Sequence, residues 1–141
     1  MATRRIASAV AALAVGVLST VSVAPAQTYP DKPIKIIVPG APGGPTDVPA
    51  RLATQILPPR LGQPVVVETR PGAAGAIGAK AVAAAAPDGY TLLAANTSVL
   101  AVIPAVSASA GYDPAKHFAP VARSHRASRS WWCIRRFRRR R

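Results

Sequence analysis

The sequence contains few acidic residues, few aromatic residues and a single cysteine, Cys133. One cysteine cannot form an intramolecular disulfide, which excludes the small disulfide-stabilised folds. The two histidines, His117 and His125, have no other His, Cys or carboxylate at metal-ligand spacing. No Ser, His and acid follow a hydrolase pattern, and neither glycine-rich segment ends in Gly-Lys-Ser or Gly-Lys-Thr. We therefore predict no catalytic residue, no metal and no cofactor.

Positive charge is abundant but unevenly distributed. The formal net charge is +13, a value that ordinarily suggests a polyanionic partner. Between Gln27 and Ala122, however, seven Lys or Arg residues face five acids, for a net charge of +2. Nine arginines lie between Arg123 and Arg141. Because the central part is nearly neutral, no nucleic-acid partner is expected for it.

The N-terminus has the three parts of a secretory signal. Arg4 and Arg5 precede an uncharged stretch from Ile6 to Val23, and Ala24-Pro25-Ala26 provides small residues at the cleavage positions. A membrane-spanning anchor is the alternative, because an uncharged stretch of this length is near the lower limit for a span. Interruption by Ser and Thr and the terminal A-x-A site favour a cleaved signal. We predict a signal peptide over residues 1–26 and a periplasmic location.

Residues 27–122 contain two repeats of strand, glycine-rich turn and helix. Ile34–Val38 is β-branched and mostly apolar without clean alternation, as expected of a strand buried on both faces, and Pro64–Glu68 is predicted as a second strand. Helices are predicted over residues 46–57 and 76–86, and a third strand over Tyr90–Ala95. This order predicts a βαβαβ unit in an α/β fold with a mainly parallel sheet.

Finer features of these helices are also predicted. Val48, Leu52 and Ile56 recur at four-residue spacing and form the apolar face of the first helix. Pro58-Pro59 is expected to end that helix. A short helix interrupted by Pro104 is expected after residue 97.

Ligands of open parallel sheets bind beyond the carboxyl ends of the strands. Pro42–Asp47, Gly72–Gly78 and Asn96–Ser98 fall there in this sequence. Glycines allow main-chain N–H groups to approach a ligand, and two of these segments precede helices whose N-termini favour an anion. The pattern predicts a small anionic ligand held by neutral donors. The predicted ligand-binding residues are Pro42, Gly43, Gly44, Thr46, Asp47, Gly72, Ala73, Gly75, Ile77, Gly78, Thr97 and Ser98.

Structural interpretations of the same residues stay open. A glycine-rich turn after a strand is more often a tight connection than a binding loop. Asp47 is better explained as a residue that caps a helix or compensates its dipole than as a catalytic acid.

Several motifs occur in an order that is shared with one family. They are Tyr29–Pro39, Ala41–Asp47, Leu61–Glu68, Arg70–Ala73, Ile77-Gly78, Pro87–Leu93, Tyr112–Pro114 and Phe118–Val121. Together they closely resemble the substrate-binding proteins of tripartite tricarboxylate transporters, the Bug family, over essentially all of residues 1–121.

This resemblance implies a two-domain, Venus-flytrap fold of the type 2 periplasmic binding proteins. It implies capture of a small carboxylate and its delivery to membrane permease subunits. It also implies that main-chain groups and waters in the first two strand-to-helix loops hold the ligand. Residues 27–122 would then be the N-terminal part of the solute-binding lobe.

The resemblance ends at the arginine-rich segment 123–141, which we expect to be a disordered tail. Trp131-Trp132-Cys133-Ile134 must be encoded as TGG TGG TGY ATH, and the frame one base earlier allows Leu-Val-Val-His-Pro-Ser. Such a strand is similar to what the family carries at this point. We therefore hypothesise a frameshift upstream of Trp131.

Two expectations follow for the chain as given. As a non-functional fragment, it should bind carboxylates poorly or not at all and fold marginally, because a sheet without its returning strands leaves an exposed hydrophobic edge. The alternative function is that of a small basic protein that binds nucleic acid or membranes through clustered arginines with Trp and Phe.

Overall fold

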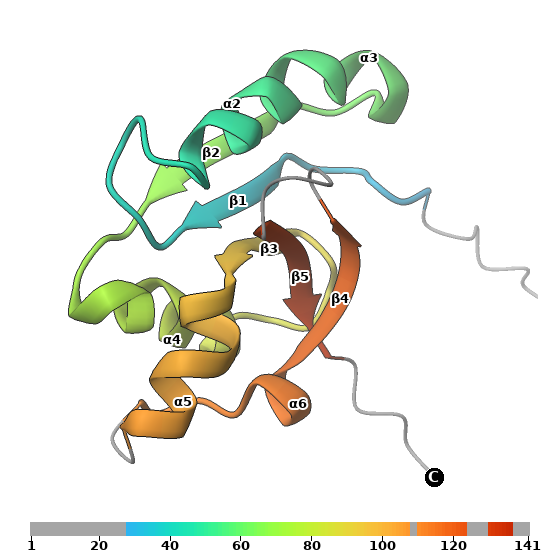
Figure 1. The fold of residues 1–141 in the computed structure, drawn as a ribbon. Coiled ribbons are helices and arrows are strands. Elements are labelled where there is room, and N and C mark those ends of the chain that lie inside the picture. The colour runs from blue at the N-terminus through green and yellow to red at the C-terminus, as the bar shows by residue number, and fades with distance from the viewer. Residues whose placement is uncertain (1–27, 108–109, 124–129, 137–141) are drawn as a thin grey trace, which may run out of the picture.

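The computed structural model describes residues 28–107, 110–123 and 130–136, which form one five-stranded sheet with helices on both faces (Figure 1). The strand order is β2-β1-β3-β5-β4. β1 pairs in parallel with β2 and β3, whereas β5 runs antiparallel to β3 and β4. The predicted βαβαβ unit is confirmed, but the sheet is mixed rather than mainly parallel. The strands are β1 (Ile34–Val38), β2 (Val65–Thr69), β3 (Thr91–Asn96), β4 (Phe118–Arg123) and β5 (Ser130–Arg135).

The helices are short, and three of them have a proline in their first two positions. Pro58 ends α2 as predicted but also starts α3, because proline suits the first turn of a helix. Pro104 lies near the start of α5 and does not interrupt the helix. Within the described ranges, no helix has the length and apolar character to cross a membrane. The helices are α2 (Asp47–Ile56), α3 (Pro58–Leu61), η2 (Ala73–Gly75), α4 (Ala76–Ala84), the π-helical η3 (Ser98–Val102), α5 (Ile103–Val106) and α6 (Pro114–His117).

The arginine-rich segment contributes a strand, which corrects the prediction of a disordered tail there. β5 lies between β3 and β4, and Leu93 pairs with the 3 %-exposed Cys133. Its bulky apolar residues have high β propensity, and β3 would otherwise present unpaired main-chain groups. β5 therefore covers the side of β3 that lacks β1, so that β2 and β4 form the sheet edges. Residues 124–129 and 137–141 of the predicted tail lie outside the described residues.

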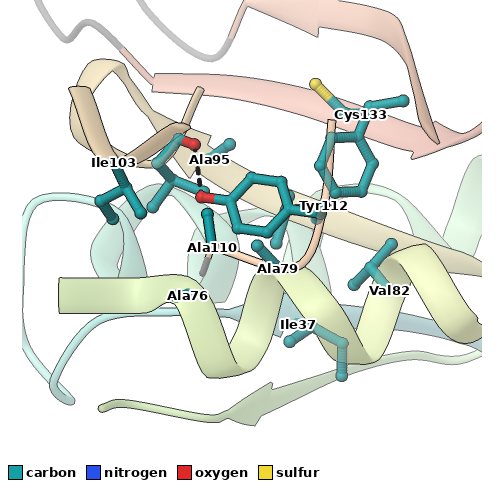
Figure 2. Close-up of a cluster of buried hydrophobic side chains, with 12 residues drawn as sticks. Ile37, Ala76, Ala79, Val82, Ala95, Ile103, Ala110, Tyr112 and Cys133 are labelled. Carbon is teal, nitrogen blue, oxygen red and sulfur yellow. Dashed lines mark hydrogen bonds between the residues drawn. The ribbon is translucent and has the colours of Figure 1, made fainter. Parts of the chain in front are cut away.

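One hydrophobic core fills the space between the sheet and α4, η3 and α5. Figure 2 shows Tyr112 at its centre, between Ala79 of α4 and Cys133 of β5. The Tyr112 hydroxyl donates a 2.7 Å hydrogen bond to the main-chain oxygen of Val99, a buried residue of η3. Tyr112 thus anchors the segment that precedes α6 in the core.

A second core lies beneath α2, on the opposite face of the sheet. α2 packs through the small residues Ala50 and Ala53, whereas Val48, Leu52 and Ile56 are 50, 51 and 58 % exposed. The apolar face that the spacing predicts is therefore not the buried face. Small side chains let the helix approach the sheet closely, and this packing determines its orientation. The larger apolar residues of α2 instead border an open groove.

Candidate functional site

A pocket of about 300 Å³ lies where the loops after β1, β2 and β3 converge. All three loops leave the carboxyl ends of parallel strands, the edge at which such sheets bind ligands. Among the residues that the structure describes, no charged side chain lines it. The lining residues are Pro39, Gly40, Ala41, Pro71, Gly72, Ala74, Gly75, Asn96 and Val99.

In the loop after β1, the structure separates the predicted residues from the pocket. Pro42, Gly43, Gly44, Thr46 and Asp47 do not line it, and the three residues directly after β1 do. The predicted residues instead form consecutive turns. The Gly44 N–H donates to the Ala41 oxygen at 3.1 Å, and the Asp47 N–H donates to the Gly44 oxygen at 3.0 Å.

Thr46 and Asp47 stabilise this loop without lining the pocket. Thr46 occupies the N-cap position of α2 but makes no side-chain capping bond, and Asp47 lies in the first turn of the helix. Asp47 is fully buried, and its Oδ2 accepts hydrogen bonds from Arg51 Nε and the Gly43 N–H, each at 2.7 Å. The bond from Arg51, followed by the bond from Gly43, lowers the pKa of the Asp47 carboxyl below its ordinary value. Asp47 is therefore a charged structural group of the loop.

The loop after β2 contributes four pocket residues, two of which were predicted. Gly72 and Gly75 line the pocket together with Pro71 and Ala74, but the predicted Ala73 does not. From Gly72 to Gly75, φ is 121°, 46°, 55° and 107° in turn. The two alanines therefore adopt a left-handed conformation that costs a non-glycine residue about 1–2 kcal/mol. Strain of this kind is frequent at binding sites, where the surrounding structure must hold it.

The remaining predicted residues of this loop have packing roles. A Cβ on Gly78 would lie 2.9 Å from Pro39 Cβ and 3.0 Å from the Arg70 oxygen. Gly78 thus allows α4 to pack directly against the loop after β1. Ile77 is 52 % exposed, and its Cδ1 would be 2.6 Å from a Cβ on Gly72. Ile77 therefore covers the outer side of the turn and does not line the pocket.

At the end of β3, the pocket is lined by Asn96, the last residue of the strand, and by Val99 of η3. The predicted hydroxyl residues Thr97 and Ser98 are exposed and do not line it. Asn96 Oδ1 accepts a 3.0 Å hydrogen bond from the Val99 N–H, which fixes the side chain. Because Oδ1 serves this bond, the Nδ2 group is the donor that Asn96 can offer to a ligand.

Besides Asn96, which lies in a predicted segment, six lining residues were not predicted as ligand-binding residues: Pro39, Gly40, Ala41, Pro71, Ala74 and Val99. Three of them, Pro39, Gly40 and Pro71, lie within two residues of a strand end. The prediction placed the site nearer to the helices, where glycine is most concentrated. Distance along the chain from the strand end would have located these residues better than glycine content.

The chemistry of the pocket suits an anion held by neutral groups. Glycines in the lining allow the main chain to approach a ligand closely, and the Gly75 N–H itself donates to the Gly72 oxygen at 2.8 Å. The first turn of α4 follows directly with the partial positive charge of a helix N-terminus. Within the described part of the chain, no three or more His, Cys, Asp or Glu residues are grouped to hold a metal ion. His117 has a local role, since its Nδ1 accepts the Asp113 N–H at 2.9 Å.

A second pocket of about 440 Å³ differs in chemistry. It is the groove beside α2. Among the described residues that line it there is no charged side chain, and most of its surface is apolar carbon. A carboxylate placed there would lose its hydration without gaining donors, which is unfavourable. The groove is lined by Pro49, Leu52, Ala53, Ile56, Leu57, Leu92, Val121, Ala122 and Trp132.

Comparisons with known proteins agree in one family. The model described as the tripartite tricarboxylate transporter family receptor, TctC, matches residues 49–132. A UPF0065 protein of Bordetella bronchiseptica is 48 % identical over 103 residues, which are 73 % of this chain and 31 % of that protein. The protein BugT of Bordetella pertussis is 49 % identical over 98 residues, or 69 % of this chain and 30 % of that protein. The chain thus spans about a third of the length of these curated relatives.

Solved structures match with the same coverage. A structure described as a periplasmic transporter is 56 % identical with a TM-score of 0.64, covering 67 % of this chain and 32 % of the other. MatC from Rhodopseudomonas palustris, solved with bound malate, is 41 % identical with a TM-score of 0.62, covering 66 % and 32 %. Rpa4515 from R. palustris, solved with adipate, is 38 % identical with a TM-score of 0.63, covering 66 % and 31 %.

The mixed sheet, the loops at the carboxyl ends of its parallel strands and these matches agree with the resemblance seen in the sequence motifs. The chain belongs to the tripartite tricarboxylate transporter receptor family of substrate-binding proteins, which are not enzymes.

Proposed function

We propose that this chain forms the N-terminal part of a periplasmic solute-binding lobe and holds one carboxylate group of a small carboxylic acid. The observation that carries the proposal is the pocket between the three loops. Its walls combine glycine main chain, the Asn96 amide and the N-terminal end of α4 without a charged side chain. Neutral donors of this kind stabilise a carboxylate by hydrogen bonds and dipoles, so that no counter-charge is needed.

Related proteins support the choice of ligand class. MatC and Rpa4515 were solved with malate and adipate, both dicarboxylates. Our proposal extends this ligand class to the present chain, with Gly72, Gly75 and Asn96 as contacts. The predicted residues that do not line the pocket would support the loops instead. Membrane permease subunits of the transporter would receive the ligand from the complete lobe pair.

Export is part of the same proposal. The solved relatives include proteins described as periplasmic. We propose that residues 1–26 direct the chain to the periplasm and are removed after Ala26. The measurement is mass spectrometry of the chain recovered from a periplasmic fraction. A mass that begins at Gln27 is expected, and an intact N-terminus in a cytoplasmic fraction would contradict export.

Ligand binding can be measured on the chain itself. We expect malate and adipate to shift the amide NMR signals of Gly40, Gly72 and Gly75 saturably, with weak affinity because one lobe alone cannot enclose the ligand. The neutral diamide of succinic acid controls for solvent effects. Asn96→Leu should weaken the response to malate, whereas the neighbouring exposed Thr97→Val should not. Shifts that are spread over the surface, or that are equal for malate and the diamide, would contradict the proposed site.

The alternative, polyanion binding through the arginine-rich segment, is less consistent with the described residues. Arg135 Nη1 donates hydrogen bonds to the main-chain oxygens of Ala84 and Ala85 at the end of α4. Its charge therefore compensates a helix C-terminus. The Arg123 guanidinium lies 5.7 Å from the ring centre of Trp131, and this pair is the part of β4 and β5 that could contact a polyanion.

A further inference from the structure

Asp47 is a buried charge that the proposed ligand contacts do not use. Its side chain is fully buried, and it does not line the pocket. Burial of a carboxylate is costly unless hydrogen bonds or an ion pair compensate it. Oδ2 has two such bonds, from Gly43 and Arg51, whereas buried Oδ1 has no hydrogen-bond partner among the described residues. A group that is this costly to bury requires an explanation.

The position of Asp47 connects it to the pocket wall. Its Oδ2 holds the N–H of Gly43, which adopts a φ of 77° in the middle of the loop after β1. The adjacent Thr46 is 3 % exposed, and its Oγ1 would be 3.1 Å from a Cβ on the pocket residue Gly40. The N-terminal turn of α2 thus packs directly behind the residues that line the pocket.

Arg51 supplies the compensating charge from the solvent side. It lies one helical turn after Asp47, and its side chain is 58 % exposed. An unpaired carboxylate behind the loop would repel a carboxylate ligand, since charges at short range inside a protein interact more strongly than in water. The ion pair removes most of this repulsion while the hydrogen bond to Gly43 remains.

We propose that Asp47 and Arg51 form a positioning pair for the ligand-binding loop. Asp47 fixes the loop through the Gly43 N–H, and Arg51 neutralises the Asp47 carboxylate so that an anion can bind in front of it. Neither residue contacts the ligand. The inference rests on the proposed carboxylate function, and its loop component can be tested without ligand.

The test compares charge removal at matched positions. Asp47→Asn keeps the side-chain size and one acceptor oxygen but removes the charge-assisted bond to Gly43. Arg51→Gln removes the neutralising charge from an exposed position, and a urea denaturation curve of this variant shows whether the fold is retained. Arg60→Gln is the control, because Arg60 is an exposed arginine on α3 with the same change in net charge.

Two measurements distinguish an effect on the loop conformation from an effect on ligand binding. We expect Asp47→Asn to raise the amide hydrogen-exchange rate of Gly43 about tenfold relative to Ile36 in β1, a charge-assisted bond being roughly twice as strong as a neutral one. We expect Arg51→Gln to weaken malate binding several-fold, and Arg60→Gln to leave it unchanged. Unchanged Gly43 exchange in Asp47→Asn, or equal effects of Arg51→Gln and Arg60→Gln, would overturn the positioning pair. A wild-type chain without any response to malate would refute the proposed function, and Gly43 exchange would still decide the role of Asp47.

Discussion

Replacement of Gly78 by alanine tests the contact that holds α4 against the loop after β1. Gly78 lies inside α4, where a change from glycine to alanine normally stabilises a helix by about 1 kcal/mol. Here the new Cβ would lie 2.9 Å from Pro39 Cβ and 3.0 Å from both Pro39 Cα and the Arg70 oxygen. None of these atoms belongs to a flexible side chain, so that the helix or the loop must move.

The sign of the change in the free energy of unfolding therefore shows whether the close contact or the gain in helix propensity dominates. Overpacking of a closely packed site costs about 1–3 kcal/mol, which exceeds or cancels the gain in helix propensity. We expect Gly78→Ala to lower the free energy of unfolding by about 1 kcal/mol in urea denaturation, without a change in the dependence on urea. The Gly40 amide signal should shift as the pocket wall is displaced.

A control separates packing from backbone strain. Gly62 adopts a φ of 67°, and a Cβ added there would meet no atom within 4 Å, so Gly62→Ala introduces backbone strain alone. It should lower stability by about 1 kcal/mol and leave the Gly40 signal unchanged. An increase in stability for Gly78→Ala would refute the close contact between α4 and Pro39.

Further predictions concern strain, titration and the arginine-rich segment. Ala74→Gly should raise stability by up to about 1 kcal/mol in urea denaturation, because glycine relieves the left-handed strain at a smaller entropic cost. Burial raises the pKa of the Cys133 thiol to about 11, so its stabilising contribution is complete below the ordinary value of 9.0 and is lost as the pH rises to about 11. Thermal melts of wild type and Cys133→Ala across this pH range should converge if this is correct, and a constant difference would contradict it. Salt-sensitive retention on heparin should disappear when residues 137–141 are deleted, since clustered arginines act through counterion release; retention that persists would place the polyanion contact on the folded part. DNA sequencing across codons 115–141 and onward should reveal coding sequence that resembles the family in another frame, and its absence would contradict the frameshift hypothesis.

The sequence alone determined the elements whose causes are local. β-branched runs predicted β1 and β2, and proline and glycine located the turns. Apolar spacing predicted α2, and alanine-rich helix propensity predicted α4, each to within about two residues. The alternation of strand and helix predicted parallel strands with right-handed crossovers, so that the loops after them leave one edge of the sheet. The order β2-β1-β3 came from the structure.

Only the tertiary structure decided which side chains face a partner. Ala50 and Ala53 bury α2 where the spacing favours Leu52 and Ile56, because close approach to the sheet outweighs the local apolar pattern. β5 pairs with β3 because the main-chain groups on that side of β3 would otherwise lack hydrogen-bond partners. This pairing joins residues that are distant in the sequence. After β1 the pocket is likewise lined by the residues that directly follow the strand, whereas Thr46, Asp47 and Gly78 pack against the loops without lining the pocket. The residue types in a loop indicate that the loop suits an anion. Which of those residues line the pocket depends on the contacts between loops.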